Sequence, residues 1–342
     1  MNQVRQSTCE HQLLDSARSG DASAYQQLVE PYRRELLAHC YRMLGSGEDA
    51  EDALQDTLLR AWRGLPGFEG RSAIRTWLYK ITTNICLNLL AKRPKRLLAV
   101  DYGPVAIPEN SLSIPLPESV WIEPYSDELL GLKDDWASPE VRYEQRESVE
   151  LAFIAAFQLL PPYQRATLIL RQVLGFSAQE VADSLGTTVA SINSALQRAR
   201  ITLEQRRPKL SQQAALLTLG DNQLQTIVKN YMDAMESADI EAILVMLTED
   251  ATWSMPPRPS WFCGREAISR FLSIHVFSVR WRHLPTRANG QLAVGCYMWN
   301  PQTNTYTAAC LDVLTLRGAR IAAVTGFMND KFFRLFNLPE EL

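Results

Sequence analysis

Apolar residues recur at intervals of three and four in three successive segments near the start of the chain. This spacing predicts amphipathic helices over residues 21–44, 48–62 and 74–93. The second segment has a distinct inner side, which includes Ala53, Leu54 and Ala61. Its outer side is polar and acidic, and carries Asp49, Asp52, Gln55, Asp56 and Arg60.

The helical pattern is lost over residues 97–137, where prolines accumulate. This composition predicts a linker, although Trp121, Ile122 and Tyr125 are too apolar to stay exposed. We expect this patch to dock on a partner or on a neighbouring domain. Ser138, Pro139 and Glu140 are typical of a helix start, and residues 147–207 return to helical spacing.

The last part of the chain changes its pattern from helix to strand. Residues 221–250 predict a pair of amphipathic helices. Alternating or continuous apolar segments rich in β-branched and aromatic residues follow, at 251–256, 278–288, 291–300, 306–318 and 320–329. Gly, Pro and Asn separate them, as expected of turns. The C-terminal part is therefore expected to be an α+β domain with a mostly antiparallel sheet.

The segment 175–200, GFSAQEVADSLGTTVASINSALQRAR, has the spacing of a helix-turn-helix. Ser177 and Glu180 form a capping-box signature, and Gly186 supplies a tight turn before a second helix capped by Thr187 or Thr188. The outer face of that helix is small and polar, with no basic residue before Arg198. The pattern fits a helix that docks in the major groove, and a plain helical hairpin is the alternative.

The net charge of −3 over 342 residues does not by itself favour nucleic-acid binding. The charges are nevertheless segregated: residues 60–100 and 161–210 are basic, and residues 101–150 are acidic. This distribution suggests two nucleic-acid contacts joined by an acidic linker.

Composition excludes several other classes of protein. The six cysteines include no CxxC pair, and Cys9 with His11 offers too few ligands, so we expect neither a metal site nor a cofactor. Buried or incidental thiols are the expectation. No apolar run approaches the roughly 20 residues of a membrane span, and the N-terminus lacks the layout of a signal peptide. A cytoplasmic protein without membrane contacts is therefore expected.

Two blocks of sequence resemble one protein family. Residues 159–200 resemble the promoter-reading C-terminal domain of extracytoplasmic-function (ECF) sigma factors, through the Leu-Pro pair, the capping box and the closing Arg198-Ala199-Arg200. DAEDALQDTLLRAW (49–62) and FEGRSAIRTWLYKITTNICLNLL (68–90) resemble the first domain of the same family. Because the two blocks stand in the family's order, they are more specific together than a single helix-turn-helix.

The resemblance implies partners and site residues. The partners would be core RNA polymerase, at its clamp and flap regions, and promoter DNA. The residues that match the polymerase-binding helix are Asp49, Asp52, Gln55, Asp56 and Leu59. The residues that match the base-capturing loop and the helix along the melted minus-ten strand are Arg71, Ser72, Arg75, Thr76, Trp77, Lys80, Asn84 and Asn88. For Trp77 a core position is the alternative, and its inward phase slightly favours the core.

In the second helix of the helix-turn-helix, the candidates for the minus-thirty-five element are polar or basic. They are Thr188, Ser191, Asn193, Ser194, Gln197, Arg198 and Arg200. Arg165, Arg171, Arg206, Arg207 and Lys209 are candidates for phosphate contacts nearby. With its charge shifted to Arg198 and Arg200, this helix is expected to gain little electrostatic affinity of its own.

A third resemblance covers the C-terminal part. Residues 222–257, 261–268 and 326–339 resemble a SnoaL-like domain of the ketosteroid-isomerase-like cone fold, and the linker motif WIEPYSDELL resembles sigma factors with this fusion. The resemblance implies a regulatory extension with a pocket that can hold a small-molecule ligand. Candidate pocket residues are Trp253, Trp261, His275, Trp281, His283, Tyr297 and Asp312. No titratable pair is enforced by the sequence, so we expect no catalysis, and packing of a curved sheet is the alternative for each residue.

The expected fold is therefore multidomain: two all-α sigma domains at 10–95 and 139–209, an acidic linker at 96–138, and a SnoaL-like α+β cone domain at 221–342. The expected function is transcription initiation as a sigma factor modulated by its own C-terminal domain. Two alternatives remain: a conventional regulator of duplex DNA, and a SnoaL-like enzyme or small-molecule sensor fused to a DNA-binding module.

Overall fold

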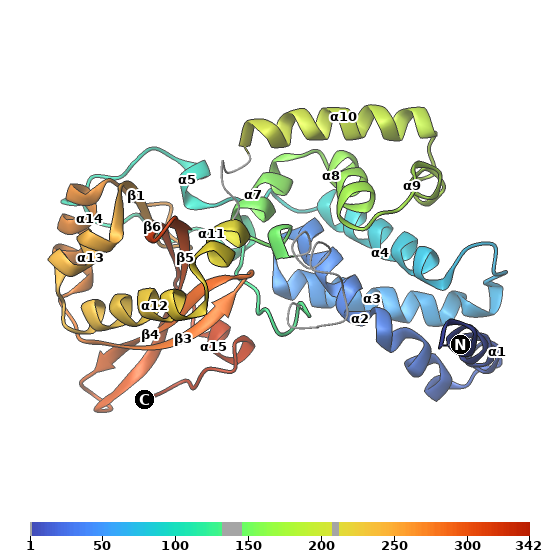
Figure 1. Ribbon diagram of the computed structural model, residues 1–342, viewed down its shortest axis with the longest axis horizontal. Helices are drawn as coiled ribbons and strands as arrows, with labels where there is room; N and C mark the ends of the chain where they lie inside the picture. The colour runs from blue at the N-terminus through green and yellow to red at the C-terminus, as the bar shows by residue number, and fades with distance from the viewer. Residues whose placement is uncertain (1, 132–145, 207–211) are drawn as a thin grey trace. The chain divides into compact units, whose positions relative to one another are not determined.

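The computed structural model describes residues 2–131, 146–206 and 212–342, in two compact units (Figure 1). One unit combines Met1–Arg93 with Phe157–Gln205, and the other combines Pro94–Ala156 with Arg206–Leu342. We call them the helical unit and the C-terminal unit. The helix start expected at 138–140 lies outside the described residues, as do Arg207 and Lys209. The expected domain borders stay predictions.

The N-terminal part of the helical unit is a packed set of helices. They are α1 (Asn2–Arg18), α2 (Ala22–Leu44), α3 (Gly47–Gly64), a 3₁₀ turn (Leu65–Gly67) and α4 (Ile74–Leu90). Local chemistry fixes their ends. Asp21 accepts hydrogen bonds from the first turn of α2, and Gly45, with a φ of 71°, ends that helix in the left-handed conformation. Ser46 then caps α3 through the Asp49 N–H.

The second part of the helical unit contains the helix-turn-helix. It comprises α8 (Pro162–Leu168), a π-helical turn (Ile169–Val173), α9 (Ala178–Leu185) and α10 (Val189–Arg206). The predicted capping box is confirmed: Ser177 Oγ accepts from Glu180 N–H, and the Glu180 carboxylate accepts from Ser177 N–H. Gly186 adopts a φ of 64° between the two helices, and Thr188 Oγ1 accepts from Ser191 N–H at the start of α10. α7 (Leu151–Leu159) runs across the boundary of the two units in sequence.

A six-stranded sheet organises the C-terminal unit, in the order β2-β1-β6-β5-β4-β3. The strands are β1 (Leu247–Ser254), β2 (Trp261–Cys263), β3 (Trp281–Ala288), β4 (Gln291–Asn300), β5 (Thr305–Arg317) and β6 (Arg320–Phe327). β1 and β6 pair in parallel and the other neighbours are antiparallel, so the mostly antiparallel α+β domain is confirmed.

Helices cover this sheet and enclose an apolar core (Figure 1). They are α11 (Gln212–Leu219), α12 (Asp221–Glu236), α13 (Ile240–Met246) and α14 (Arg265–Phe271) with a π-helical turn (Leu272–Val276). α15 (Lys331–Leu335) contributes no residue to this core and packs instead through Phe333 on Tyr297. The core gathers Tyr231 from α12, Trp253 from β1 and Phe271 from α14, all with at most 3% of their surface exposed. The helices and the sheet thus form two layers of a cone-like fold, with the apolar core between them.

The linker packs on the cone domain. It contains α5 (Ala99–Tyr102) and a 3₁₀ turn (Glu118–Val120). Its backbone N–H groups donate to the domain, from Ala106 to Trp261 O at 2.8 Å and from Leu116 to Pro257 O at 2.9 Å. The apolar patch is buried: Trp121 is 3% exposed, and Ile122 and Tyr125 are fully covered. The expected docking of this patch is therefore confirmed, with the cone domain as its neighbour.

Candidate functional sites

The outer face of α3 is exposed at most of the predicted polymerase-binding positions. Asp52, Gln55 and Leu59 are exposed, with Leu59 at 47%, and Asp56 is half-buried in an ion pair with Arg60 at 2.8 Å. Exposed carboxylates beside an exposed leucine offer both charge and apolar contact to a protein partner. The face is therefore available for binding.

The placement of Asp49 on that outer face is wrong. Asp49 is 6% exposed and forms an ion pair with Arg93, which follows α4. Helical periodicity alone cannot detect this pairing, because the arginine comes from a distant turn. Asp49 instead ties the first turn of α3 to the end of α4, where its charge also favours the helix N-terminus.

The predicted residues of the minus-ten surface fall into two groups on the loop and on α4. Arg71, Ser72, Lys80, Asn84 and Asn88 are exposed. Arg75, Thr76 and Trp77 are half-buried, and Trp77 packs on Phe68 with ring centres 4.9 Å apart. The exposed group has the cations and amides that suit a single strand, while Trp77 also belongs to the packing of the loop.

Arg75 is held by partners inside the helical unit. Its guanidinium lies 3.0 Å from Glu35 Oε2 and contacts the rings of both Tyr79 and Phe176, at 5.0 and 4.9 Å from their centres. Beside it, Thr76 Oγ1 donates to Glu180 Oε1 at 3.3 Å. The first turn of α4 is thus joined to the start of the helix-turn-helix in this state.

The outer face of α10 presents all its predicted DNA-binding side chains. They are Thr188, Ser191, Asn193, Ser194, Gln197, Arg198 and Arg200, and each is exposed. Val189, Ile192, Leu196 and Ala199 lie on the opposite side, where Ile192 and Ala199 are at most 2% exposed. A polar, exposed helix face backed by a packed one is the arrangement that enters a groove.

One candidate phosphate contact is wrong. Arg165 is 2% exposed and donates to Gln158 Oε1 at 2.6 Å and to the carbonyls of Gln158 and Leu160 at 3.0 and 3.2 Å, as well as to Met43 O. Burial lowers the pKa of this guanidinium to about 10. Arg165 of α8 is therefore a structural residue, which joins its own helix to the end of α2 and to the segment before α8.

The cone domain encloses a cavity of about 110 Å³. Of the predicted pocket residues, Trp253, His275, Trp281, His283 and Asp312 line it. The prediction is wrong for Trp261, whose Nε1 donates to Gly103 O at 2.8 Å, and for Tyr297, whose hydroxyl donates to Pro339 O at 2.9 Å. Tyr297 follows Cys296, which lines the cavity, and successive strand residues face opposite sides.

A buried polar cluster around Asp312 lies on one side of the cavity. The Tyr231 hydroxyl donates to Asp312 Oδ2 at 2.8 Å, and Cys296 and Cys310 lie beside the carboxyl. Burial raises the pKa of Asp312 above its usual range and raises the pKa values of both thiols. Tyr231 and the two cysteines were not among the predicted pocket residues, because the packing of α12 on the sheet and the register of β4 and β5 bring them together.

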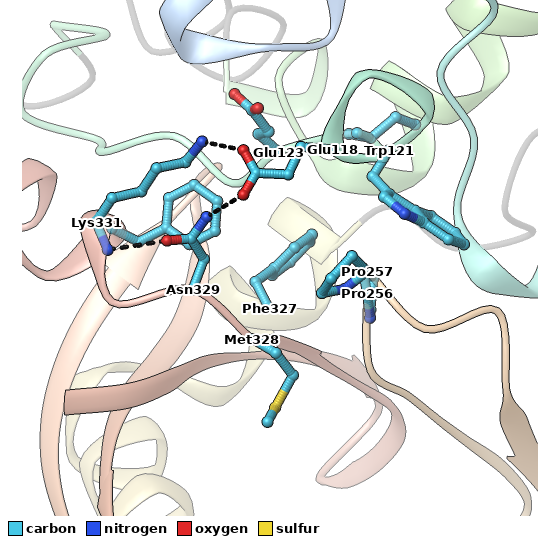
Figure 2. Close-up of a pocket in the computed structure, with 11 residues that line it drawn as sticks. Glu118, Trp121, Glu123, Pro256, Pro257, Phe327, Met328, Asn329 and Lys331 are labelled. Carbon is cyan, nitrogen blue, oxygen red and sulfur yellow. Dashed lines mark hydrogen bonds and ion pairs between the residues drawn. The ribbon is translucent and has the colours of Figure 1, made fainter. Parts of the chain in front are cut away.

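A second, smaller pocket lies between the linker and the cone domain (Figure 2). Glu118 of the linker accepts from Lys331 Nζ at 2.6 Å and from Asn329 Nδ2 at 2.8 Å. Pro256, Pro257 and Phe327 supply the apolar wall opposite Trp121. Charge and apolar contacts therefore hold the same stretch of linker.

None of the helices in the described ranges is long and apolar enough to cross a membrane.

Comparison with known proteins places these features in a family. The sequence matches Sigma-70 region 2 over residues 28–96, Sigma-70 region 4 over 150–203 and the SnoaL-like domain over 228–324. It is 41% identical over 330 residues to the ECF RNA polymerase sigma factor SigG of Mycobacterium tuberculosis, covering 95% of this chain and 86% of that protein. It is 29% identical over 195 residues to the RNA polymerase sigma-H factor of Pseudomonas aeruginosa, covering 57% and 92%.

The fold also has a relative among solved structures. The crystal structure of the Mycobacterium tuberculosis extracytoplasmic function sigma factor SigJ matches with a TM-score of 0.57 at 20% identity, over 91% of this chain and 98% of that chain. At 20% sequence identity, this match supports the fold alone. With the SigG relationship and both sigma regions, it leads to one conclusion: the chain belongs to the ECF RNA polymerase sigma factors and carries a SnoaL-like domain at its C-terminal end.

Proposed function

We propose that this sigma factor binds core RNA polymerase through the exposed face of α3 and binds promoter DNA through α4 and α10. α3 would press Asp52, Gln55, Asp56 and Leu59 against the polymerase clamp. The loop and α4 would capture and line the melted minus-ten strand, and α10 would read the minus-thirty-five element. The observation that supports this most directly is that every predicted side chain on the polar face of α10 is exposed, while the opposite apolar face is packed.

Binding energy accounts for the activity without covalent chemistry. Unstacked bases need cations, amides and stacking faces, which Arg71, Lys80 and Asn84 provide in part. Phosphate contacts from Arg198 and Arg200 would position α10, and Ser191 and Gln197 can both donate to and accept from base edges. We therefore regard the protein as a non-enzymatic regulator that acts in the cytoplasm, where its polymerase would be.

We also propose that the SnoaL-like domain modulates the sigma regions by holding the linker that joins them in sequence. Three kinds of contact support this: the Lys331–Glu118 ion pair, the backbone bonds from Ala106 and Leu116, and the buried Ile122. A domain that binds the linker restricts the geometries that the two sigma regions can adopt on polymerase. A ligand in the 110 Å³ cavity is the second part of this proposal, because Leu112 of the linker also lines that cavity.

Run-off transcription with purified core polymerase tests the proposal. The full chain should initiate from its promoters, whereas a regulator of duplex DNA would bind without supporting transcripts. A chain that lacks residues 221–342 should still bind polymerase and show altered promoter activity. Identical transcription by both proteins would remove the modulatory role, and turnover of a substrate by the C-terminal domain would support an enzyme instead.

Exchanging the charges of Glu118 and Lys331 tests whether this contact holds the linker. Glu118→Lys and Lys331→Glu each place like charges together, so each should release this part of the linker and change transcription. The double variant restores an ion pair of opposite polarity and should return toward the original activity. Equal effects of single and double variants would show that this contact does not act through the linker.

A further inference from the structure

Four side chains with metal-binding atoms lie on one face of the sheet, and three of them form a close cluster. His283 of β3 is directly opposite Cys296 of β4, and Cys296 is directly opposite Cys310 of β5. Asp312 lies two residues beyond Cys310 on β5. Directly opposite residues, and residues two apart, share a face of a sheet. All four line the same cavity and each is at most 7% exposed.

Three of these groups are already close enough to share an ion. The two thiol sulfurs and a carboxylate oxygen of Asp312 lie within 4.8 Å of one another, and Cys310 Sγ is 3.9 Å from Asp312 Oδ1. Tyr231 holds the other carboxylate oxygen at 2.8 Å and so orients the first one. Gly326 leaves room for it, because a Cβ there would lie 2.7 Å from Asp312 Oδ1.

The environment of His283 points independently to a bound ligand. Neither of its ring nitrogens has a hydrogen-bond partner among the described residues, although its side chain is fully buried. Buried polar atoms without partners are rare and call for an explanation. Its Nδ1 lies 3.6 Å from Glu236 Oε1, and that carboxylate is fixed by His283 N–H at 2.9 Å and by Arg282 at 2.7 Å. At 3.6 Å the contact of Nδ1 is not a hydrogen bond. Histidines that bind metals donate their second ring nitrogen to such a carboxylate, and a small shift of the ring would make that bond while Nε2 binds the metal.

We propose that Cys296, Cys310 and Asp312 bind a thiophilic transition-metal ion, for which Zn²⁺ is the probe, and that His283, whose ring nitrogens lie outside this group of three in the structure, turns in as the fourth ligand. Two sulfurs, one imidazole and one carboxylate form a four-ligand set of the kind that zinc accepts in tetrahedral sites. The ion enters as the thiol protons leave to solvent, so binding releases protons. Bound metal would satisfy His283 and give the clustered acidic groups a counter-charge.

The cavity that holds the proposed metal site is also in contact with the linker. Leu112 lines the same cavity, and Arg258, which also lines it, donates to Ser113 O at 2.6 Å. Metal binding would therefore stabilise the wall that the linker contacts. This regulatory consequence rests on the proposed modulatory role of the C-terminal domain, whereas the binding itself does not.

The test measures zinc on the reduced full-length chain by dialysis and elemental analysis, without polymerase. The wild type should retain zinc that a Cys296→Ser/Cys310→Ser variant loses. The matched control is Cys40→Ser/Cys86→Ser, which removes another pair of fully buried, neighbouring thiols, from α2 and α4. The control should keep the zinc of the wild type. Equal zinc in all three proteins would overturn the assignment, as would no zinc in the wild type.

Further readouts do not depend on the folding of a cysteine variant. Cobalt bound to the wild type should give thiolate-to-metal charge-transfer absorption, and zinc should displace it; absence of that absorption counts against the site. Glu236→Gln should weaken zinc binding by about 10–100-fold, because it removes the carboxylate behind His283. A wild type that takes up no metal when reduced and forms a Cys296–Cys310 disulfide in air would replace this proposal with a redox pair.

Transcription is measured separately, with and without zinc. Failure of the wild type to bind zinc would overturn the metal site and would leave the proposed sigma-factor function unaffected. Zinc binding with unchanged transcription would instead overturn only the regulatory consequence.

Discussion

The guanidinium of Arg75 on α4 stacks on the ring of Phe176, 4.9 Å from its centre, where the chain turns into the helix-turn-helix. Tyr79 contacts the same phenylalanine edge-on at 5.1 Å, and Glu35 pairs with the arginine. A residue expected to bind the melted promoter strand therefore has partners within the protein. A DNA phosphate must compete with the Glu35 carboxylate and the two rings for this cation.

Phe176→Ala should loosen the packing of the helix-turn-helix on α4. Phe176 is 6% exposed, and removal of a buried phenylalanine ring costs about 3–5 kcal/mol of unfolding free energy. Urea unfolding should show a lower midpoint for the helical unit, and proteases should cut the variant faster. Phe176→Leu keeps most of the apolar volume and should lose much less; equal losses would mean that the ring contacts, and not the buried apolar volume, stabilise this packing.

Asp56→Arg should weaken the association with core polymerase. The substitution reverses a charge at the centre of the exposed α3 face and places two arginines together, because Arg60 is the present partner of Asp56. Co-purification or fluorescence titration with core polymerase measures the effect. Glu30→Arg, an exposed charge reversal on α2, is the control and should bind normally. Unchanged binding of Asp56→Arg would refute the assignment of this face.

Two classes of substitution on α10 should affect DNA binding differently. Arg198→Ala with Arg200→Ala removes two candidate phosphate contacts, so the slope of log affinity against log salt should fall by about 2. Gln197→Ala should leave that slope unchanged and reduce discrimination between promoter bases by about 1–3 kcal/mol. Binding of holoenzyme to promoter variants over a salt series separates the two. A salt effect from Gln197→Ala would reverse the assigned roles.

The stability of the helical unit should fall in mild acid because of His39. This side chain is fully buried with its Nε2 2.9 Å from Thr83 Oγ1, and desolvation, with the nearby Arg42 and Arg75, lowers its pKa to about 3. The unfolded chain takes up a proton below about pH 6.5, so stability is full above that pH and is lost as the pH falls toward 3.

This loss should amount to about 1.4 kcal/mol per pH unit, or about 2 kcal/mol between pH 6.5 and pH 5. Urea midpoints at the two pH values measure it. His39→Gln should show a smaller change between them, whereas His11→Gln, an exposed position on α1, should behave as the wild type. The same acid sensitivity in His39→Gln would assign the effect to other groups.

Local signals predicted much of the fold. The capping box at Ser177 and Glu180, the left-handed Gly186 and the strands at 291–300 and 306–318 all have their expected structure, because caps, turns and alternation depend on a few neighbouring residues. The exposed face of α10 follows from the same periodicity. The comparisons confirmed the sigma-factor and SnoaL-like resemblances, which rested on the order of such motifs.

The two misplaced charged residues, Asp49 and Arg165, share one physical cause. Asp49 has the helical phase of an exposed residue, and its burial depends on Arg93, which folds back from the far end of α4. Arg165 has the sequence character of a phosphate ligand, yet backbone carbonyls of two other segments surround it. Partners that are distant in the chain override local preference, since burial of a charge is tolerated only where such partners exist.

The sequence by itself determined the secondary structure of most segments, the family and the surfaces that face outward, since these depend on local spacing and motif order. Only the tertiary structure decided which polar groups share an interior. His283, Cys296, Cys310 and Asp312 show no metal-ligand spacing along the chain, and the spacing of the cysteines gave no expectation of a site. The antiparallel register of β3, β4 and β5 sets them side by side, because strand pairing converts separations of about a dozen residues into adjacent positions on one face.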